Sequence, residues 1–325
     1  MKRLLSGIQP SGELHVGNYL GAIRNWVDLQ DEYEAFYCVV DLHAMTVNSP
    51  APESLGERTI NMATALLACG LDPEKSTLFV QSHLTEHSEL AWILNCVTPM
   101  GELYRMTQFK DKSSQHQQNI NVGLFTYPVL QAADILLYQA SAVPVGEDQV
   151  QHIELTREIA RKFNARFKKV FTEPKAVLTR TGRIRGLDGQ AKMSKTLNNQ
   201  IPLLADEDAI HKLLRPAFTD PARLRRTDPG NPKVCNLFPL HQGFSPDDDI
   251  QRVDKECRKA EIGCVECKRL LGANMAETLA PIREKYHALG NDHVQGVLRD
   301  GAERARAVAS KTLEKVRYGA KLLKV

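Results

Sequence analysis

The sequence contains no long apolar run and carries little net charge. No stretch approaches the roughly 20 apolar residues that cross a bilayer, and the opening segment, MKRLLSGIQPSG, lacks the apolar core of a secretory signal. The formal net charge is +3 over 325 residues, so a polyanionic partner has to be inferred from local basic clusters. We therefore expect a cytoplasmic protein with no membrane partner, whose cysteines are not structural disulfides.

The sequence also has no internal repeat and no low-complexity tract. The pattern of apolar residues changes near residue 200. Before that point, short apolar runs alternate with stretches of helical periodicity, and residues 35–40 and 77–80 are predicted to be buried strands. This alternation predicts an α/β fold with a parallel sheet. Beyond residue 200 the strand signals nearly vanish, so we expect a helical second domain.

Two segments have the composition of a phosphate site. LLSGIQPSGELHVGNYLGAI places an apolar strand, a turn and a helix start at Gly17 and Asn18 within twenty residues, an order that presents backbone N–H groups to an anion. GLDGQAKMSKTLNN places Lys192 and Lys195 three apart in a segment with loop composition. Each segment alone also has an ordinary explanation, a packing turn in the first case and a solvated lysine pair in the second.

Taken together, these segments resemble the two signature motifs of the class I aminoacyl-tRNA synthetases. Residues 15–18, HVGN, are similar to the HIGH motif with Asn18 in place of its second histidine, and residues 192–196, KMSKT, are similar to KMSKS with Thr196 in place of serine. The segments SGIQPSG, VVDLHAMT, GELYRMTQFKDK, YPVLQAADILLY and VPVGEDQVQHIELTREIARKFN extend the resemblance to the tryptophanyl-tRNA synthetases over essentially the whole chain.

The resemblance implies a fold and an activity. The fold would be a Rossmann-like catalytic domain over residues 1–200, with a dimerisation segment inserted at about 75–140, and a helical anticodon-binding domain over residues 201–325. The activity would be activation of L-tryptophan by ATP and Mg²⁺ in a homodimer, followed by transfer to tRNA(Trp). Lys192 and Lys195 would be the catalytic pair, and the residues implied in ATP binding are Gln9, Pro10, Ser11, Gly17, Asn18, Gly146, Glu147, Asp148, Ile184, Lys192, Met193, Ser194, Lys195 and Thr196.

Asp134 is the candidate for choosing the amino acid. It lies in the apolar segment LQAADILLY, where an ionised carboxylate has either a structural role or a ligand. The resemblance implies that Asp134 accepts a hydrogen bond from the indole N–H, and a buried acceptor left unpaired would penalise phenylalanine or leucine. His43, Tyr127 and Gln149 would line the same pocket, and Gln131 stands where many bacterial members of the family have methionine.

Four of the seven cysteines form a cluster in the sequence, whereas Cys38, Cys69 and Cys96 are isolated in apolar surroundings. Four thiolates suit either a tetrahedral zinc or a [4Fe–4S] cluster, and spacing alone leaves both open. The resemblance favours iron, because a subset of bacterial members has a C-x22-C-x6-C-x2-C pattern, from which this chain departs by one residue in the first gap. The four candidate ligands are Cys235, Cys257, Cys264 and Cys267.

Two other functions remain open at this point. Tyrosyl-tRNA synthetases share the fold and the motifs, and a catalytically silent relative could bind RNA or sense redox state through its cysteines. The intact ATP motifs argue against the silent relative. Basic residues near the cysteines could meet the anticodon stem, namely Arg258, Lys259, Lys268 and Arg269.

Overall fold

The computed structural model describes residues 1–47, 53–108, 120–178, 184–195 and 197–323, which fall into two compact units. Unit 1 comprises Met1–Gly12, Trp26–Thr179 and Gly290–Val325, and unit 2 comprises Glu13–Asn25 and Arg180–Leu289. The units therefore do not divide the chain at residue 200. Both the start and the end of the chain belong to unit 1, while a short early segment belongs to unit 2.

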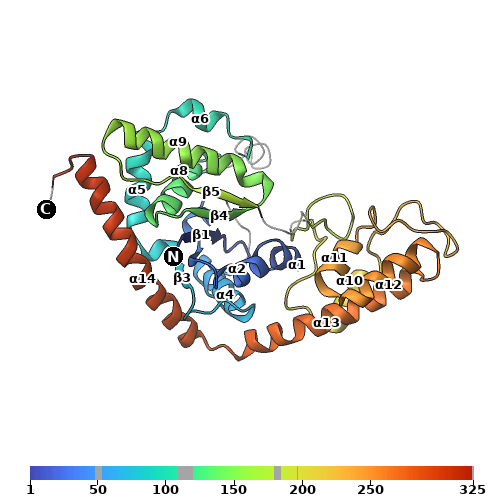
Figure 1. Cartoon of the computed structure of the whole chain (residues 1–325). Helices are drawn as coiled ribbons and strands as arrows, with labels where there is room; N and C mark the ends of the chain where they lie inside the picture. The colour runs from blue at the N-terminus through green and yellow to red at the C-terminus, as the bar shows by residue number, and fades with distance from the viewer. Residues whose placement is uncertain (48–52, 109–119, 179–183, 196, 324–325) are drawn as a thin grey trace. The chain divides into compact units, whose positions relative to one another are not determined.

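Unit 1 is built on a parallel five-stranded sheet with the order β3-β2-β1-β4-β5 (Figure 1). The two strands predicted from the sequence are present, and all the pairings are parallel. From its second residue onward β2 is continuously buried, as expected of a parallel strand covered on both faces. The strands are β1 (Arg3–Ile8), β2 (Glu34–Val39), β3 (Thr77–Val80), β4 (Ala142–Val145) and β5 (Lys175–Leu178).

Helices cover the sheet of unit 1, with α8 and α9 against one face and α4 against the other (Figure 1). Local sequence sets several helix starts: Ser54 and Glu57 form a capping box at α4, and the Asn121 side chain accepts from the Leu124 N–H at α8. The helices of this unit are α2 (Arg24–Leu29, which begins in unit 2), α3 (Asp41–Ala44), α4 (Leu55–Ala68), η2 (Gln81–His83), α5 (Glu86–Asn95), α6 (Met100–Tyr104), α8 (Val122–Leu137), η3 (Glu147–Gln149), α9 (Val150–Arg166) and α14 (Asn291–Gly319).

The last helix, α14, packs on β3, α4 and α5 of unit 1 (Figure 1). At Gly301 the helix approaches β3 so closely that a Cβ would lie 1.8 Å from the Leu78 carbonyl oxygen. Arg306 donates to the His83 carbonyl, and Arg317 pairs with Glu89. The helix thus covers the edge strand of the sheet, which removes an open edge from solvent.

Unit 2 is largely helical, as the sequence predicts for the region beyond residue 200. Its first segment contains a short α-helix that continues as a π-helical turn, which the sequence did not reveal. Among the described residues of the whole chain, no helix has the length and apolar character needed to span a membrane. The helices of unit 2 are α1 (Val16–Asn18), η1 (Tyr19–Ile23), α10 (Glu207–Leu214), α11 (Phe238–Phe244), α12 (Asp247–Arg258) and α13 (Cys264–Ala288).

Candidate active site

The strand order of unit 1 reverses between β1 and β4, and ligands in open α/β sheets bind at the carboxyl ends of strands beside such a reversal. Gln9, Pro10 and Ser11 follow β1, and residues 146–148 follow β4. Because the two strands pair in parallel, both segments lie at the same edge of the sheet. The sheet topology therefore places these predicted ATP-binding residues where a nucleotide site is expected.

The turn after β4 depends on a glycine. A Cβ on Gly146 would lie 2.7 Å from the Asp148 Oδ1, so a larger residue would push this carboxylate away. The Asp148 Oδ2 accepts hydrogen bonds from the Gln108 Nε2 and the Gln149 Nε2, each at 3.1 Å. Glu147 and Asp148 are exposed, so their carboxylates are open to a ligand such as a ribose.

In unit 2, His15 and Asn18 form a capping box at the start of α1. The Asn18 N–H donates to the His15 Nδ1 at 3.3 Å, and the His15 N–H donates to the Asn18 Oδ1 at 3.1 Å. The departure from the HIGH motif at Asn18 therefore has a structural use, because the amide oxygen satisfies a backbone donor at the helix start. Burial and, to a smaller extent, the charge of Lys192 together lower the pKa of His15 to about 4, so this ring is neutral at pH 7.

The second motif lies against the first within unit 2. A Cβ on Gly17 would meet the His15 ring at 3.0 Å and the Met193 Cβ at 3.4 Å, so glycine permits this close packing. Met193 is the buried residue of the second motif, and its N–H donates to the Ile184 carbonyl. The Ser194 N–H donates to the Asn199 Oδ1 at 2.8 Å. The two motifs therefore form one packed structure, as their resemblance to a bipartite nucleotide site requires.

The two lysines of the second motif are accessible to a ligand rather than packed against the protein. Lys192 and Lys195 are both exposed, and neither forms an ion pair with any residue in the described part of the chain. Two ammonium groups beside a helix start can neutralise phosphate charge. Thr196, the last residue of the motif, lies outside the described residues.

Asp134 is the most strongly hydrogen-bonded side chain of the site. It is 3% exposed, and its two oxygens contact the His43 Nε2 at 2.9 Å and the His87 Nδ1 at 2.7 Å. The Gln81 Nε2 donates to both oxygens, at 2.8 and 2.9 Å. Burial by itself would raise the pKa of Asp134, but the hydrogen bonds from His43 and His87 hold it well below its ordinary range. The carboxylate is therefore ionised at neutral pH.

Sequence reasoning missed Gln81, His87 and Tyr138. Gln81 and His87 are buried, on η2 and α5, and the His87 Nε2 lies 2.9 Å from the Tyr138 hydroxyl. The available signals were a polar residue directly after strand 77–80, a histidine in the helix that follows, and a tyrosine one helical turn after Asp134. Such residues are usually satisfied core groups, and only the fold brings Gln81 and His87 to Asp134.

The other residues predicted to bind tryptophan lie at different depths. Tyr127 is buried, its ring faces that of His43 edge-on with centroids 6.3 Å apart, and its hydroxyl lies 2.9 Å from the His152 Nε2. Gln131 is half-buried one turn before Asp134 on α8, and Gln149 lies in the turn after β4. His43, Tyr127 and Asp134 thus form one cluster in unit 1.

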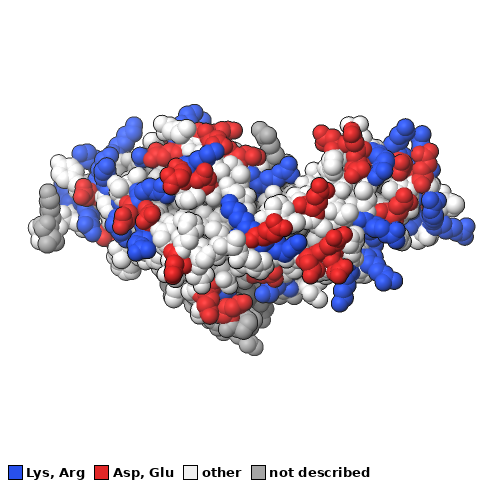
Figure 2. Space-filling view, turned by 90° about the horizontal axis from the view of Figure 1, so that it is seen from below, with Lys and Arg blue, Asp and Glu red and all other residues white. Residues whose placement is uncertain are grey.

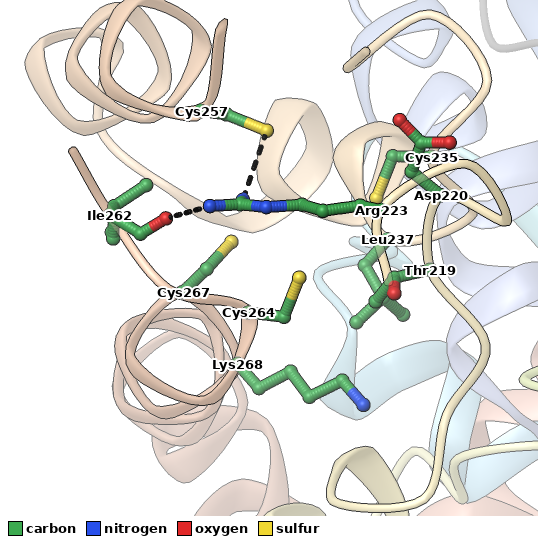
Figure 3. A pocket seen from close by; sticks show the side chains of 10 residues that line it. All are labelled: Thr219, Asp220, Arg223, Cys235, Leu237, Cys257, Ile262, Cys264, Cys267 and Lys268. Atoms are coloured by element: carbon green, nitrogen blue, oxygen red, sulfur yellow. Dashed lines mark hydrogen bonds between the residues drawn. The ribbon is translucent and has the colours of Figure 1, made fainter. Parts of the chain in front are cut away.

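The four clustered cysteines line one cavity of unit 2 (Figure 3). The Arg223 side chain extends across it, with its Nη1 3.6 Å from the Cys257 Sγ and its Nη2 2.6 Å from the Ile262 carbonyl oxygen. Burial and, to a smaller extent, the neighbouring cysteines together raise the pKa of Cys267 to about 12. As a free thiol, Cys267 is therefore protonated at neutral pH.

The cavity fits a group that accepts hydrogen bonds and carries negative charge. The Arg223 Nε is buried and has no partner among the described residues, and Lys268 lines the same cavity. A thiolate-bound metal or cluster would supply such acceptors. As the side chains stand, however, no three metal-binding residues within the described ranges are arranged to hold an ion. The four cysteines predicted as one set of ligands thus line a single cavity of unit 2.

The basic residues near the cysteines are largely engaged in local contacts. Arg258 forms two hydrogen bonds to Asp254, and the Lys268 ammonium donates to the carbonyls of Arg215 and Ala217. Figure 2 shows Lys and Arg interspersed with Asp and Glu over the face that it draws. On that face, the mixture of charges agrees with the small net charge of the chain.

Both the sequence and the fold are similar to those of known proteins. Residues 1–280 match the family model described as tRNA synthetases class I (W and Y). The chain is 52% identical to the tryptophan–tRNA ligase of Deinococcus radiodurans, with 100% of both chains covered, and 46% identical to that of Thermotoga maritima, with 99% of both covered. The chain belongs to the tryptophan–tRNA ligases. This membership favours tryptophan over tyrosine as the amino acid activated.

A solved structure agrees with the assignment to this family. The tryptophanyl-tRNA synthetase of Campylobacter jejuni, complexed with ADP and tryptophan, superposes with a TM-score of 0.86 at 37% identity and covers 98% of this chain and 100% of its own. The chain is thus an aminoacyl-tRNA synthetase with the Rossmann-like fold and the helical C-terminal region expected of it. The roles of its individual residues remain predictions.

Proposed function

We propose that this synthetase selects L-tryptophan with the Asp134 carboxylate, activates it with Mg²⁺-ATP and transfers it to tRNA(Trp). The observation that carries the proposal is a buried, ionised carboxylate at the carboxyl edge of the sheet, which contacts His43, whose ring in turn faces Tyr127. A buried acceptor of this kind recognises a ring N–H and disfavours rings without a donor. Gln149 and Gln131 would complete the pocket.

Activation needs no protein nucleophile. An oxygen of the tryptophan carboxylate attacks the α-phosphorus of ATP, the bond from that phosphorus to its bridging oxygen breaks, and pyrophosphate leaves. Lys192 and Lys195 would neutralise the charge that develops on the leaving phosphates, and Mg²⁺ bound to those phosphates would share this task. A ribose hydroxyl of the tRNA then attacks the acyl carbonyl, and AMP leaves.

The remaining predicted nucleotide contacts divide by chemistry. The exposed carboxylates in the turn after Gly146 suit the ribose hydroxyls, and Gln9 and Ser11 offer polar groups after β1. In unit 2, the backbone at Gly17 and Asn18 provides N–H groups at a helix start. Ile184 and Met193 are buried supports of the second motif.

Amino-acid-dependent ATP–pyrophosphate exchange tests this proposal. Exchange that requires tryptophan, with tyrosine and phenylalanine at least 100-fold poorer in kcat/KM, is the expected result and would correspond to roughly 3 kcal/mol of discrimination. Preference for tyrosine would make the chain a tyrosine enzyme. The silent, RNA-binding alternative predicts no exchange with either amino acid, although tRNA would still bind.

We also propose that Cys235, Cys257, Cys264 and Cys267 hold a [4Fe–4S] cluster, with Zn²⁺ as the alternative occupant. When bound, either group would stabilise the folded domain by joining chain segments through metal–thiolate bonds. Arg223 and Lys268 are placed to offset its negative charge. Protein purified without oxygen should be brown with broad absorption near 400 nm if the cluster is present, whereas a colourless protein with one zinc per chain would identify zinc.

The cysteine site would serve tRNA recognition rather than activation. Cys267→Ser should weaken charging of tRNA(Trp) while ATP–pyrophosphate exchange is retained, because Lys195 and Asp134 do not line this cavity. Cys96→Ser is the matched control, since that cysteine lies at an exposed position in unit 1. Loss of exchange in Cys267→Ser with the fold intact would contradict this assignment.

Assembly as a cytoplasmic homodimer through residues 75–140 is a further prediction, and sedimentation velocity would test the dimer.

A further inference from the structure

The hydrogen bonds to Asp134 leave little room for another donor. An ionised carboxylate has about four acceptor positions, and Asp134 already has three donors, namely His43, His87 and the Gln81 Nε2, which contacts both oxygens. Because Asp134 is also only 3% exposed, a substrate N–H that bonds to it has to enter where a protein side chain now lies. The question is therefore which of these donors gives way.

His87 and Gln81 are both enclosed by the protein, and the Gln81 Oε1 has no hydrogen-bond partner among the described residues. Both are fully buried, and His87 is fixed from two sides, by Asp134 at its Nδ1 and by Tyr138 at its Nε2. Burial raises the pKa of Tyr138 well above its ordinary value, so this side chain stays a hydroxyl. The Nδ1–H tautomer of His87 can then donate to Asp134 and accept from Tyr138. Gln81 has to present its Nε2, because an ionised carboxylate only accepts.

His43 is held less firmly. It is 5% exposed, belongs to the four-residue helix α3, and makes a single contact to Asp134, at Oδ2. Its ring faces Tyr127, which is 6% exposed, so both rings border the more open side of the cluster.

We propose that Gln81 and His87 are fixed positioning donors of Asp134, that Tyr138 locks His87, and that His43 is a replaceable donor whose place the ring N–H of the amino acid takes. This inference rests on the proposed function, since it assigns a mechanism to the same carboxylate. Tryptophan exchanges one donor for another and leaves Asp134 satisfied. A substrate whose ring has no N–H cannot replace His43, which then stays in the space that the substrate needs. Such a substrate is therefore disfavoured twice, by the position of His43 and by the absence of a hydrogen bond to Asp134.

Tyr138→Phe tests the fixed donors, because it removes only the hydroxyl behind His87. The substrates are tryptophan and benzothienylalanine, in which sulfur replaces the ring N–H. We expect the variant to raise the KM for tryptophan about 5- to 10-fold, since a buried hydrogen bond is lost, with kcat unchanged. The KM for benzothienylalanine should stay at the wild-type value, because that substrate makes no bond to Asp134.

Tyr37→Phe is the matched control. Its hydroxyl is also buried and donates at 2.8 Å to the Trp26 carbonyl, away from Asp134. It should leave both KM values unchanged. An equal rise in KM for the two substrates in Tyr138→Phe would mean a general packing defect and would overturn the role of the fixed donors, as would no rise for either.

Spectra of protein labelled with ¹⁵N-histidine test the replaceable donor. Tryptophan should shift the ring resonances of His43, assigned by their loss in His43→Gln, while those of His87 stay in place. Benzothienylalanine should not release His43 from Asp134. A shift of His87 with His43 unmoved would reverse the assignment. ATP–pyrophosphate exchange by the wild-type protein distinguishes failure of this inference from failure of the proposed function. If tryptophan supports no exchange, the proposed function is wrong. If exchange is normal but tryptophan leaves the spectra unchanged, only this inference is wrong.

Discussion

The pocket around Asp134 and the motif loop at residues 192–195 handle charge in opposite ways. Asp134 is ionised in a place from which water is almost excluded, and neighbouring donors satisfy it fully. Lys192 and Lys195 are exposed and form no ion pair within the described ranges. Fixed geometry suits the choice between similar rings, whereas accessible charge suits a leaving group whose charge grows during the reaction. The difference predicts that substitutions in the two regions affect different kinetic constants.

Lys195→Ala should have the largest effect. Removal of a charge that acts on the leaving phosphates should lower the rate of adenylate formation by roughly 10²- to 10³-fold, with the dissociation constant for tryptophan unchanged. Single-turnover kinetics and equilibrium binding measure the two quantities separately. Lys212→Ala, an exposed lysine on α10 in the same unit, is the control. Equal losses of rate and affinity would erase the contrast between the two regions.

Asp134→Asn should show the opposite pattern. The amide keeps the size of the side chain but loses the charge and half of the acceptor capacity, so we expect the KM for tryptophan to rise on the order of 30- to 100-fold. The rate at saturating tryptophan should fall much less. Steady-state exchange gives both constants, and Asp208→Asn, exposed at the start of α10, should leave them unchanged. A fall confined to kcat would contradict the assignment of Asp134 to ring binding.

Gly301→Ala should show how far the buried region depends on packing. The new methyl group would collide with the Leu78 carbonyl, so the free energy of unfolding should fall by about 1–3 kcal/mol. Gly296→Ala on the same helix meets nothing within 4 Å and should stabilise the protein by about 0.5–1 kcal/mol through helix propensity. Chemical denaturation measures both changes. Equal effects would mean that α14 does not press on the sheet edge.

At neutral pH, His15 should give the smallest effect, because its contribution to stability depends on protonation. Its folded pKa of about 4 lies below the unfolded value of about 6.5, so the unfolded chain binds a proton that the folded chain does not. The free energy of unfolding should therefore rise from pH 4 to pH 6.5 and be unaffected by this group above that range. His15→Asn, which can still cap the helix, should flatten this rise by up to about 3 kcal/mol. An unchanged slope would mean that the ring is not protected from protonation.

The strands and motifs could be predicted because they depend on neighbouring residues in the sequence. The strand at residues 77–80 and the two motifs are local patterns, and the structure contains the strand and packs the motifs together. The donors of Asp134 could not be found in that way. His87 and Asp134 are 47 residues apart, with no spacing rule to connect them. The packing of α14 on β3 was also hidden, because its helical periodicity fits any apolar partner.

The contact between α14 and the sheet edge also has a consequence for synthesis. Arg306 and His83, which this contact joins, are 223 residues apart. The edge strand β3 leaves the ribosome long before the helix that covers it, so the nascent sheet carries an open, pairing-competent edge for most of translation. The edge of β3 therefore has to be kept from pairing with other chains until α14 has been synthesised and has packed on it.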